Sequence, residues 1–453
     1  MIVETFSGTR GLYNDSFREL AGSYAKAYAD FLKQENETPT IVLGYDTRPS
    51  SEAVFIRMCK VLNYEGVKVI GLGVMPTPAI EHAVRELGID GGIIITGSHN
   101  EPEHNGWKLL QNNGAILTTE QIGPIIEEAR KVKSVEGDLA FDDKHEEIVD
   151  SYCDFVKDMV KDVDFKGKFV IDPNGGAGIV VLKKLLEQFK VPGVIVNGKI
   201  GEFNRLVEPN KQSLATLKPV LKEHKAEFGF GFDCDADRVE IVLDTGEVVD
   251  GNYVLAMTAD LILEEEKGSV VTNDATSNVV KFVCDKHGVN LIEVEVGETN
   301  VVEKMAELKS PVGGEGSNGG VIVPPNKCRD GILTVFQILK FLGKRKLVDV
   351  VKEYPVYHEE RAKIKCNPSK VSETNKFLED QFSKKGYVIQ RRGDDLGTVK
   401  LVFDDGWLFF RASRTEPGAF RIIANGLDEK KVREWLNMGV EAFTLKSSRR
   451  SPL

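Results

Sequence analysis

The stretch TIVLGYDTRPSSEAVFIRMCKVLNYEGVKVIGLG, residues 40–73, decides the fold. It begins with an apolar β-branched run, passes through a polar turn and continues with the spacing of an amphipathic helix. After a glycine it ends in a second apolar run. This order of strand, helix and strand predicts a βαβ unit, in which a right-handed crossover joins two parallel strands.

The same order of features recurs twice further along the chain. The second copy is KFVIDPNGGAGIVVLKKLLEQFKVPGVIVNG at residues 168–198, and the third is SVVTNDATSNVVKFVCDKHGVNLIEVEVG at residues 269–297. A period of roughly a hundred residues is too long for a solenoid repeat. We therefore interpret the copies as three α/β domains of one kind with largely parallel sheets.

The end of the chain has a different pattern. The stretch YVIQRRGDDLGTVKLVFDDGWLFFRAS, residues 387–413, gives short alternating strands with tight Gly and Asp turns, and a helical pattern follows near residues 428–445. This order predicts an α+β domain. The predicted fold class is α/β with four domains, three similar mixed-sheet domains and a C-terminal α+β domain around a central cleft. We place these domains at residues 1–147, 148–247, 248–358 and 359–453.

The composition limits the kind of protein. Of the 453 residues, 41% are hydrophobic and 28% charged, as in a folded globular chain. The 70 acidic residues outnumber the 59 Lys and Arg and give a net charge of −11, which argues against a nucleic-acid-binding surface. No apolar run reaches the ~20 residues that span a bilayer, and MIVETFSGTRG at the N-terminus lacks a signal-peptide pattern. The 6 cysteines show no CxxC spacing, so we expect reduced thiols in a cytoplasmic protein.

An acidic motif follows the strand-like run at residues 229–232. Asp233, Asp235 and Asp237 come directly after it, and Arg238 is next. Such closely spaced carboxylates repel one another unless a cation joins them, and oxygen ligands select a hard ion such as Mg²⁺. A solvated acidic loop is the alternative, whereas an EF-hand is excluded because its Gly and terminal Glu are missing. The motif predicts a Mg²⁺ site at a strand end.

A candidate nucleophile lies in GGIIITGSHNEPEHNGWKLL, residues 91–110, where an apolar strand runs directly into Ser98 and His99. A serine at such a corner can accept or donate a transferable group, and a following helix N-terminus would stabilise an anion there. A helix N-cap is the alternative role for the serine. His99 as a base for Ser98 is a further possibility that this motif alone leaves open.

Two further loops carry groups suited to a phosphorylated sugar. In PVGGEGSNGGVIVPP, residues 311–325, Glu315 lies among glycines, where a carboxylate can accept hydrogen bonds from sugar hydroxyls. A flexible glycine loop without a ligand is the alternative. In FFRASRTEPGAFRI, residues 409–422, Arg and hydroxyl side chains offer phosphate donors on one turn between two apolar strands. The four motifs fall one per domain, which predicts a shared cleft that holds one phosphosugar.

These motifs resemble those of the α-D-phosphohexomutase family, which contains phosphoglucomutase/phosphomannomutase, phosphoglucosamine mutase and phosphoacetylglucosamine mutase. The resemblance covers the whole chain, in the family's order, and implies four domains, three of one α/β kind and a last of another kind. The matching segments are SGTRG at 7–11, GYDTRPSS at 44–51, TGSHNEPEHNGWK at 96–108, FDCDADR at 232–238, GEG at 314–316 and RASRTEP at 411–417.

The resemblance implies an isomerase. It would move a phosphoryl group reversibly between the 1- and 6-positions of an aldohexose phosphate, through a phosphoserine at Ser98 and a hexose 1,6-bisphosphate, with the last domain closing over the cleft. The implied residues are Ser98, Lys108, Arg10 and Arg238 for catalysis; Ser98, Asp233, Asp235 and Asp237 for Mg²⁺; Glu315, Ser317, Asn318 and His99 for the sugar; and Arg411, Ser413, Arg414, Thr415 and Arg421 for phosphate. As a general acid/base, Lys108 needs a lowered pKa, which cationic neighbours would supply.

The family resemblance also assigns a role to each domain. In chain order the domains would carry the phosphoserine, the metal, the sugar-recognition loop and the phosphate-binding loop. We expect small-molecule hexose phosphates as the ligands, no nucleic-acid or membrane partner, and a monomer or a homodimer.

Four departures from the family pattern leave the choice of hexose open. Glu101 replaces a proline, the GEGSNGG loop at 314–320 is one residue longer and lacks a histidine, Arg414 replaces Gly or Asn, and one extra residue precedes Arg421. Glucose and mannose phosphates are the first choice, with phosphoglucosamine mutase as the alternative because of the missing histidine. A Mg²⁺-dependent sugar phosphatase and a non-catalytic sugar-phosphate-binding protein are more distant alternatives.

Overall fold

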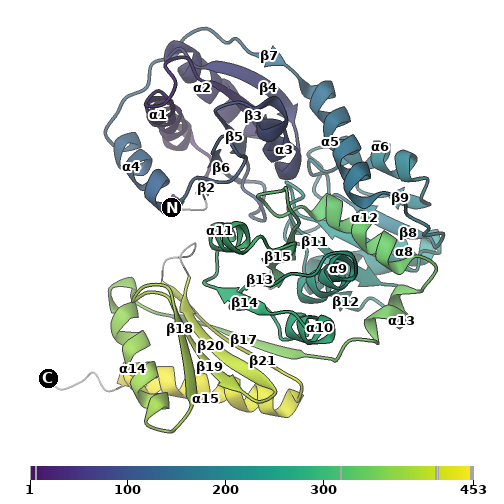
Figure 1. The fold of residues 1–453 in the computed structure, drawn as a ribbon. Coiled ribbons are helices and arrows are strands. Elements are labelled where there is room, and N and C mark those ends of the chain that lie inside the picture. The colour runs from purple at the N-terminus through teal and green to yellow at the C-terminus, as the bar shows by residue number, and fades with distance from the viewer. Residues whose placement is uncertain (1, 6–7, 317–318, 414–415, 417, 449–453) are drawn as a thin grey trace, which may run out of the picture.

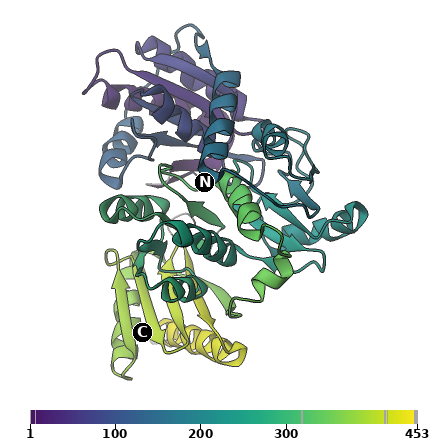
Figure 2. The ribbon, with the colours of Figure 1, turned by 45° about the vertical axis from the view of Figure 1, so that its right-hand side comes forward.

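The computed structural model describes residues 2–5, 8–316, 319–413, 416 and 418–448. Four sheets follow one another in chain order along an arc, from the purple N-terminal unit to the yellow C-terminal unit (Figures 1 and 2). The first three sheets are mixed or contain parallel pairs, and the fourth is antiparallel throughout. This confirms the predicted fold class, while the exact domain boundaries stay a prediction.

The first unit is a sheet with helices on both faces. Its elements are β1 (Val3–Thr5), β2 (Gly8–Leu12), α1 (Asp15–Leu32), β3 (Thr40–Tyr45), α2 (Ser51–Tyr64), β4 (Lys68–Val74), α3 (Thr77–Leu87), β5 (Gly91–Ile95), β6 (His104–Leu110), α4 (Thr119–Ala129) and β7 (Asp142–Asp143). The strand order is β1-β2-β6-β5-β3-β4-β7, with β3 parallel to β4 and β5. Ile41 and Leu43 pack against α1, α2 and α4, whereas Val42 packs with α3, because successive strand residues face opposite sides.

The second unit follows the same plan with a smaller sheet. Its elements are α5 (His145–Val160), β8 (Phe169–Asp172), α6 (Ile179–Phe189), β9 (Gly193–Ile195), α7 (Lys211–Leu214), α8 (Lys218–His224), β10 (Phe228–Phe232), β11 (Val239–Leu243) and β12 (Val248–Val249). The strand order is β12-β11-β10-β8-β9. In β10, Phe228, Phe230 and Phe232 are fully buried on one face, and Gly231 on the other face leaves room for Leu214. This anchored strand ends where the acidic motif begins.

The third unit contains a four-stranded sheet in the order β14-β13-β15-β16. Its elements are α9 (Gly251–Glu265), β13 (Val270–Asn273), α10 (Val279–His287), β14 (Leu291–Val294), α11 (Glu298–Leu308), β15 (Val312–Glu315), β16 (Gly320–Ile322), α12 (Gly331–Leu342) and α13 (Leu347–Val351). One hydrophobic cluster runs through all three units, from Val42 to Tyr354. The three α/β units therefore share a continuous core.

The C-terminal unit has a core of its own, which includes Phe382 and Phe410. Its elements are β17 (His358–Lys365), α14 (Val371–Ser383), β18 (Val388–Arg392), β19 (Thr398–Phe403), β20 (Gly406–Ala412), β21 (Ala419–Gly426) and α15 (Glu429–Ser448). The strand order is β17-β21-β20-β19-β18. All six cysteines are free; Cys366, directly after β17, is half-buried and the other five are buried. Within the described residues, no helix has both the length and the apolarity needed to cross a membrane.

Candidate active site

The loop that carries Ser98 is held in one shape by a buried arginine. Arg48 donates hydrogen bonds to the carbonyl oxygens of Ser98 at 2.5 Å, Asn100 at 2.6 Å and Glu101 at 2.7 Å. Asp46 in turn accepts a bond from Nε of Arg48 at 2.9 Å. Ser98 itself is fully buried and has a left-handed backbone with φ of 50°. The motif GYDTRPSS thus positions the candidate nucleophile from a different strand.

Glu101, the residue that replaces the family's proline, also fastens this loop. Its Oε1 accepts a hydrogen bond from the backbone N–H of Val207 at 3.3 Å. Val207 belongs to the second unit, so the substitution adds a link between the Ser98 loop and the unit that carries the acidic motif.

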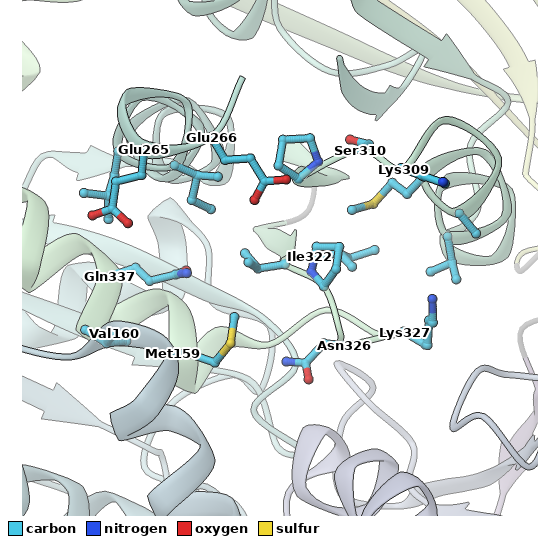
Figure 3. A pocket seen from close by; sticks show the side chains of 18 of the residues that line it. Met159, Val160, Glu265, Glu266, Lys309, Ser310, Ile322, Asn326, Lys327 and Gln337 are labelled. Carbon is cyan, nitrogen blue, oxygen red and sulfur yellow. The ribbon is translucent and has the colours of Figure 1, made fainter. Parts of the chain in front are cut away.

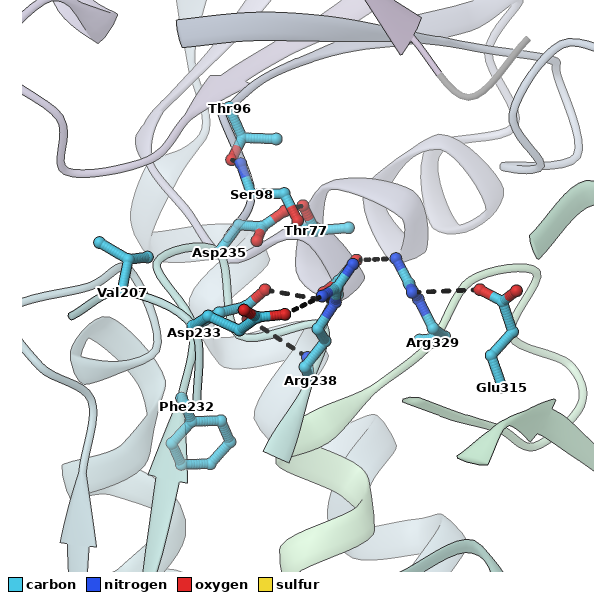
Figure 4. Close-up of polar contacts among 12 residues, drawn as sticks. Thr77, Thr96, Ser98, Val207, Phe232, Asp233, Asp235, Arg238, Glu315 and Arg329 are labelled. Carbon is cyan, nitrogen blue, oxygen red and sulfur yellow. Dashed lines mark hydrogen bonds and ion pairs between the residues drawn. The ribbon is translucent and has the colours of Figure 1, made fainter. Parts of the chain in front are cut away.

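The three aspartates converge as predicted for a metal site. Asp233, Asp235 and Asp237 are each at most 1% exposed, and one ligand atom of each lies within 4.8 Å of the other two. Among the described residues, Oδ2 of Asp233, Oδ1 of Asp235, Oδ1 of Asp237 and Oγ of Ser98 have no hydrogen-bond partner. Arg48, which donates to the carbonyl oxygen of Ser98, also interacts with the charge of Asp235, and Figure 4 draws Ser98 and Asp235 in the same region. A buried set of oxygens without donors fits a hard cation such as Mg²⁺.

Two aspartates of this cluster have pKa values that are shifted in opposite directions. Burial raises the pKa of Asp233 well above its usual range, and the charges of Asp237 and Asp235 add to this shift. Burial also acts on Asp237, but the cations Arg329 and Lys108 outweigh it and lower the pKa of that carboxyl. Thr77 meanwhile donates to Oδ2 of Asp235 at 2.6 Å. The cluster thus combines a strongly ionised carboxylate with one that is costly to ionise.

Lys108, from β6, reaches the same carboxylates. Its Nζ lies 3.3 Å from Oδ2 of Asp237 and 3.5 Å from Oδ2 of Asp235. The expectation of a lowered pKa is wrong for this arrangement. Burial does lower the pKa of Lys108, but the negative charges of Asp237 and Asp235 outweigh it, so the pKa is raised. The carboxylates around Nζ act more strongly on this pKa than the neighbouring cation Arg329 does.

Arg10, Arg238 and His99 line one side of the cleft beside this cluster. Nε of Arg238 lies 3.7 Å from Asp237 Oδ1 and 3.8 Å from Asp233 Oδ2. Burial and the charge of Arg238 lower the pKa of Arg10 to about 10. The charge of Arg238 and burial also lower the pKa of His99 well below its usual value, so this imidazole is neutral. In the described part of the chain Oγ of Ser98 has no hydrogen-bond partner, so Ser98 and His99 do not form a nucleophile–base pair.

Arg329 is the residue that the motif search missed. It is 5% exposed and pairs with Asp237 at 2.7 Å and Glu298 at 2.7 Å. It also pairs with Glu315 at 3.2 Å (Figure 4). One guanidinium therefore joins the acidic cluster of the second unit to the glycine loop of the third. No spacing rule identifies it, because its partners come from three separate segments. Its only signal is an arginine two residues before an apolar helix.

Glu315 is held at the end of β15 with its carboxylate in the cleft. Its Oε1 accepts bonds from Nδ2 of Asn273 and from the backbone N–H of Gly297, both at 2.9 Å. The other sugar-loop candidates, Ser317 and Asn318, lie outside the described residues.

The predicted phosphate residues enter the cleft from the C-terminal unit. Arg411 in β20 and Arg421 in β21 are direct cross-strand partners, and both line the cleft with Ser413. Nη2 of Arg411 donates to Oε1 of Glu295 at 3.0 Å and to the carbonyl oxygen of Val296 at 3.1 Å. Arg361 from β17 is a further cation that the motif search missed. Arg414 and Thr415 lie outside the described residues.

Side chains from all four units meet in one cleft of about 220 Å³. It brings together the following residues from the sequence-based set: Arg10, His99, Lys108, Arg238, Glu315, Arg411, Ser413 and Arg421. The arrangement offers cations, the hydroxyl of Ser413 and the carboxylate of Glu315. Ser98 and the three aspartates do not line the cleft themselves, but Lys108, Arg238 and Arg329 line it and pair with Asp237. Such a set can hold a small ligand with a phosphate and several hydroxyls.

Comparison with known proteins shows to which family the chain belongs. Models of the α/β/α domains I, II and III of phosphoglucomutase/phosphomannomutase match residues 4–136, 150–246 and 250–357. A phosphoglucomutase/phosphomannomutase of Thermococcus kodakarensis is 34% identical over 452 residues, which cover 96% of each chain. The chain belongs to the α-D-phosphohexomutase family. The resemblance drawn from the motifs is thereby confirmed.

Two further phosphohexomutase-family proteins are similar to this chain over nearly its whole length. The phosphoglucosamine mutase of Caldicellulosiruptor saccharolyticus is 29% identical over 443 residues, 94% of this chain and 95% of that one. The crystal structure of a phosphoglucomutase/phosphomannomutase family protein from Burkholderia thailandensis matches with a TM-score of 0.83 at 20% identity, covering 99% and 97% of the two chains. Phosphohexomutases are isomerases that interconvert sugar phosphates, and this chain is one of them. The family is magnesium-dependent, in accord with the aspartate cluster.

Proposed function

We propose that the chain is a phosphoglucomutase/phosphomannomutase that works through a phosphoserine at Ser98 and a hexose 1,6-bisphosphate. The observation that carries this proposal is the position of Ser98. Its hydroxyl is buried without a described hydrogen-bond partner, as is one oxygen of each aspartate in the cluster. Lys108 and Arg238 pair with that cluster and also line the cleft that Arg411 and Ser413 enter. A phosphoryl group on that hydroxyl would lie between the cluster and a bound sugar.

The chain's own residues suggest how the transfer proceeds. A sugar hydroxyl attacks phosphorus in line, the bond between phosphorus and Oγ of Ser98 breaks, and the hydroxyl proton passes to a base. We assign this role to Lys108, which can accept the proton only when a bound cation cancels the charges of Asp237 and Asp235 that raise its pKa. Asp233, Asp235 and Asp237, with Oγ of Ser98, would hold Mg²⁺, which neutralises charge on the transferred phosphoryl oxygens. Arg238 and Arg10 contribute positive charge beside the same oxygens. The bisphosphate then turns over and returns its other phosphate to Ser98.

The C-terminal unit would act as the movable clamp for the non-reacting phosphate. Its separate core allows it to move as a body. Its contacts with the third unit combine a small apolar cluster, Ala275 with Trp407, Phe409 and Ile423, with ion pairs that can exchange. Arg392 and Lys400 pair with Glu293 at 3.0 and 2.6 Å, and Arg411 pairs with Glu295 at 3.0 Å. Opening would admit the substrate and closure would exclude water, which otherwise hydrolyses a phosphoserine.

Phosphoglucosamine mutase is the second candidate function, because relatives with that name align with almost the whole chain and the sugar loop has no histidine. Glu315 accepts hydrogen bonds from both hydroxyl and amine groups, so it would serve either substrate. The proposed ligands are cytoplasmic hexose phosphates. We also propose that the protein is a monomer or a homodimer, and light scattering would distinguish the two.

The decisive experiment is ³¹P NMR of the purified protein with Mg²⁺ and a trace of glucose 1,6-bisphosphate. Glucose, mannose and glucosamine 1-phosphates are supplied separately, and the ranking of kcat/KM for their conversion to 6-phosphates names the substrate. Ser98→Ala must abolish conversion, whereas Ser369→Ala, an exposed serine of the C-terminal unit, must retain it. Release of inorganic phosphate that survives Ser98→Ala would indicate a phosphatase. Binding without any conversion would indicate a non-catalytic protein.

A further inference from the structure

A second cavity lies among α5, α9, α11, β16 and α12 (Figure 3). It has a volume of about 460 Å³, and none of its described lining residues lines the catalytic cleft. Small-molecule sites in proteins usually have volumes of ~300–1,000 Å³. The cavity is therefore large enough to be a binding site separate from the one described above.

The walls of this cavity expose apolar and polar surface in similar amounts, and one buried polar atom has no partner among the described residues. Met159, Leu261, Met305 and Ile322 supply the apolar surface. Gln337 is 4% exposed and its side chain points into the cavity in Figure 3. Its Oε1 accepts no hydrogen bond from any residue that the structure describes. Because a buried amide oxygen without a donor is unfavourable, an N–H or O–H of a ligand would stabilise it there.

The positively and negatively charged side chains around the cavity lie on opposite sides. Lys309 and Lys327 lie at one side in Figure 3, opposite Glu265 and Glu266. Glu265 is already paired with Lys340 at 2.9 Å, whereas neither Lys309 nor Lys327 forms an ion pair with a described residue. The two lysines can therefore receive an anion at the side away from the glutamates.

Two walls of the cavity lead directly to the catalytic cleft. Helix α11, which contributes Met305, begins at Glu298, and the chain that leaves the cavity at Lys327 reaches Arg329 two residues later. Glu298 and Arg329 form a 2.7 Å ion pair, and Arg329 also holds Asp237 and Glu315. An occupant that shifts or stiffens either wall would change this ion network.

We propose that the cavity binds a small anion with an apolar body, such as an aliphatic or aromatic carboxylate or sulfonate, and that the occupant alters the reaction at the cleft through Glu298 and Arg329. Binding to this cavity requires nothing of the function proposed above. Only the second half of the proposal depends on mutase activity.

Binding can be tested with 8-anilinonaphthalene-1-sulfonate, a fluorescent anion with an aromatic body and an N–H donor. Saturating glucose 1,6-bisphosphate keeps the probe out of the catalytic cleft. Ala306→Trp fills the cavity from an exposed position, and a Lys309→Ala/Lys327→Ala double variant removes its cations. Each should raise the probe's Kd at least about tenfold, and Gln337→Leu should raise it by a smaller factor. Lys183→Ala, on the exposed face of α6, is the control and should change nothing.

Equal affinity in the wild type, Ala306→Trp and the double lysine variant would overturn the proposal, as would no binding in the presence of the bisphosphate. Thermal unfolding of each variant shows that a loss of binding is not a loss of folding. Hydrogen exchange should slow in α11 and in residues 323–329 when the probe binds, a result that can be read even from a protein without mutase activity.

The coupling is measured with 8-hydroxyoctanoate, whose hydroxyl can donate to Oε1 of Gln337 and which does not interfere with an optical assay. This anion should change kcat or KM of the wild type at least about twofold and leave the Ala306→Trp variant unaffected. A probe that binds in the cavity while 8-hydroxyoctanoate leaves both constants unchanged would overturn the coupling.

Discussion

Arg329 donates a hydrogen bond from Nη2 to Oδ2 of Asp237 at 2.7 Å, across the boundary between the third and second units. The same guanidinium pairs with Glu298 and Glu315. Three buried carboxylates therefore share one cation, which connects the acidic cluster to the sugar loop.

Arg329→Ala should destabilise the protein strongly. Without the guanidinium, Asp237, Glu298 and Glu315 remain buried and lose a shared counter-charge, which typically costs about 3–5 kcal/mol. Guanidinium chloride unfolding measures the loss, and Arg329→Lys, which keeps the charge but not the fork of donors, should recover part of it. Equal unfolding free energies for the Ala variant and the wild type would show that the network contributes nothing.

Magnesium should stabilise the fold through the aspartate cluster. A ligand that binds only the folded state adds about 2.7 kcal/mol at a hundred times its Kd, so Mg²⁺ should raise Tm by several degrees and EDTA should reverse the shift. Asp235→Asn should abolish the response, while Asp244→Asn, an exposed aspartate after β11, should preserve it. A shift that persists in Asp235→Asn would place the ion elsewhere.

Glu240 should make stability decrease as the pH rises. Burial and the charge of Asp250 raise the pKa of Glu240 to about 8, against about 4.3 for an unfolded chain. Between these values the folded state holds a proton that the unfolded state has released, so wild-type stability falls across this range. Glu240→Gln mimics the protonated form, and its stability relative to the wild type should grow from pH 5 to pH 8.5, by up to about 1 kcal/mol per pH unit. Parallel pH profiles of unfolding would contradict this.

Glu295→Gln should tighten substrate binding. In this structure Glu295 accepts a bond from Nη2 of Arg411 at 3.0 Å, so a substrate phosphate must compete with a carboxylate for that guanidinium. The amide is a weaker competitor, and KM for the hexose phosphate should fall a few-fold, on the order of the 1 kcal/mol of an exposed or partly buried ion pair. A higher KM would mean that Glu295 positions Arg411 for phosphate instead.

Contiguous motifs made most of the fold and site predictable. In residues 40–73 the strand, the turn and the helix follow one another, and the parallel pairing of β3 with β4 follows from that order. The aspartate cluster was equally accessible because its three members occupy five consecutive positions of one loop. Short-range patterns of this kind encode both local structure and the position of side chains at a strand end.

What could not be predicted depends on contacts between distant segments. Arg329 binds Asp237, which is 92 positions away in the sequence, and Glu315, which is 14 positions away. No local sequence pattern predicts either contact. The pKa of Lys108 was predicted with the wrong sign for the same reason. The direction of this pKa shift depends on the charges of Asp237 and Asp235 relative to that of Arg329. The distances between these groups cannot be read from the order of residues in the sequence.

The six thiols differ in burial, so one of the chain's native cysteines can be labelled selectively. Five cysteines are buried, and Cys366 at the start of the C-terminal unit is the more accessible thiol among the six. A maleimide dye would therefore attach selectively at Cys366 without any substitution. A second dye introduced on the first unit would turn the opening and closing of the cleft into a measurable change in energy transfer, molecule by molecule.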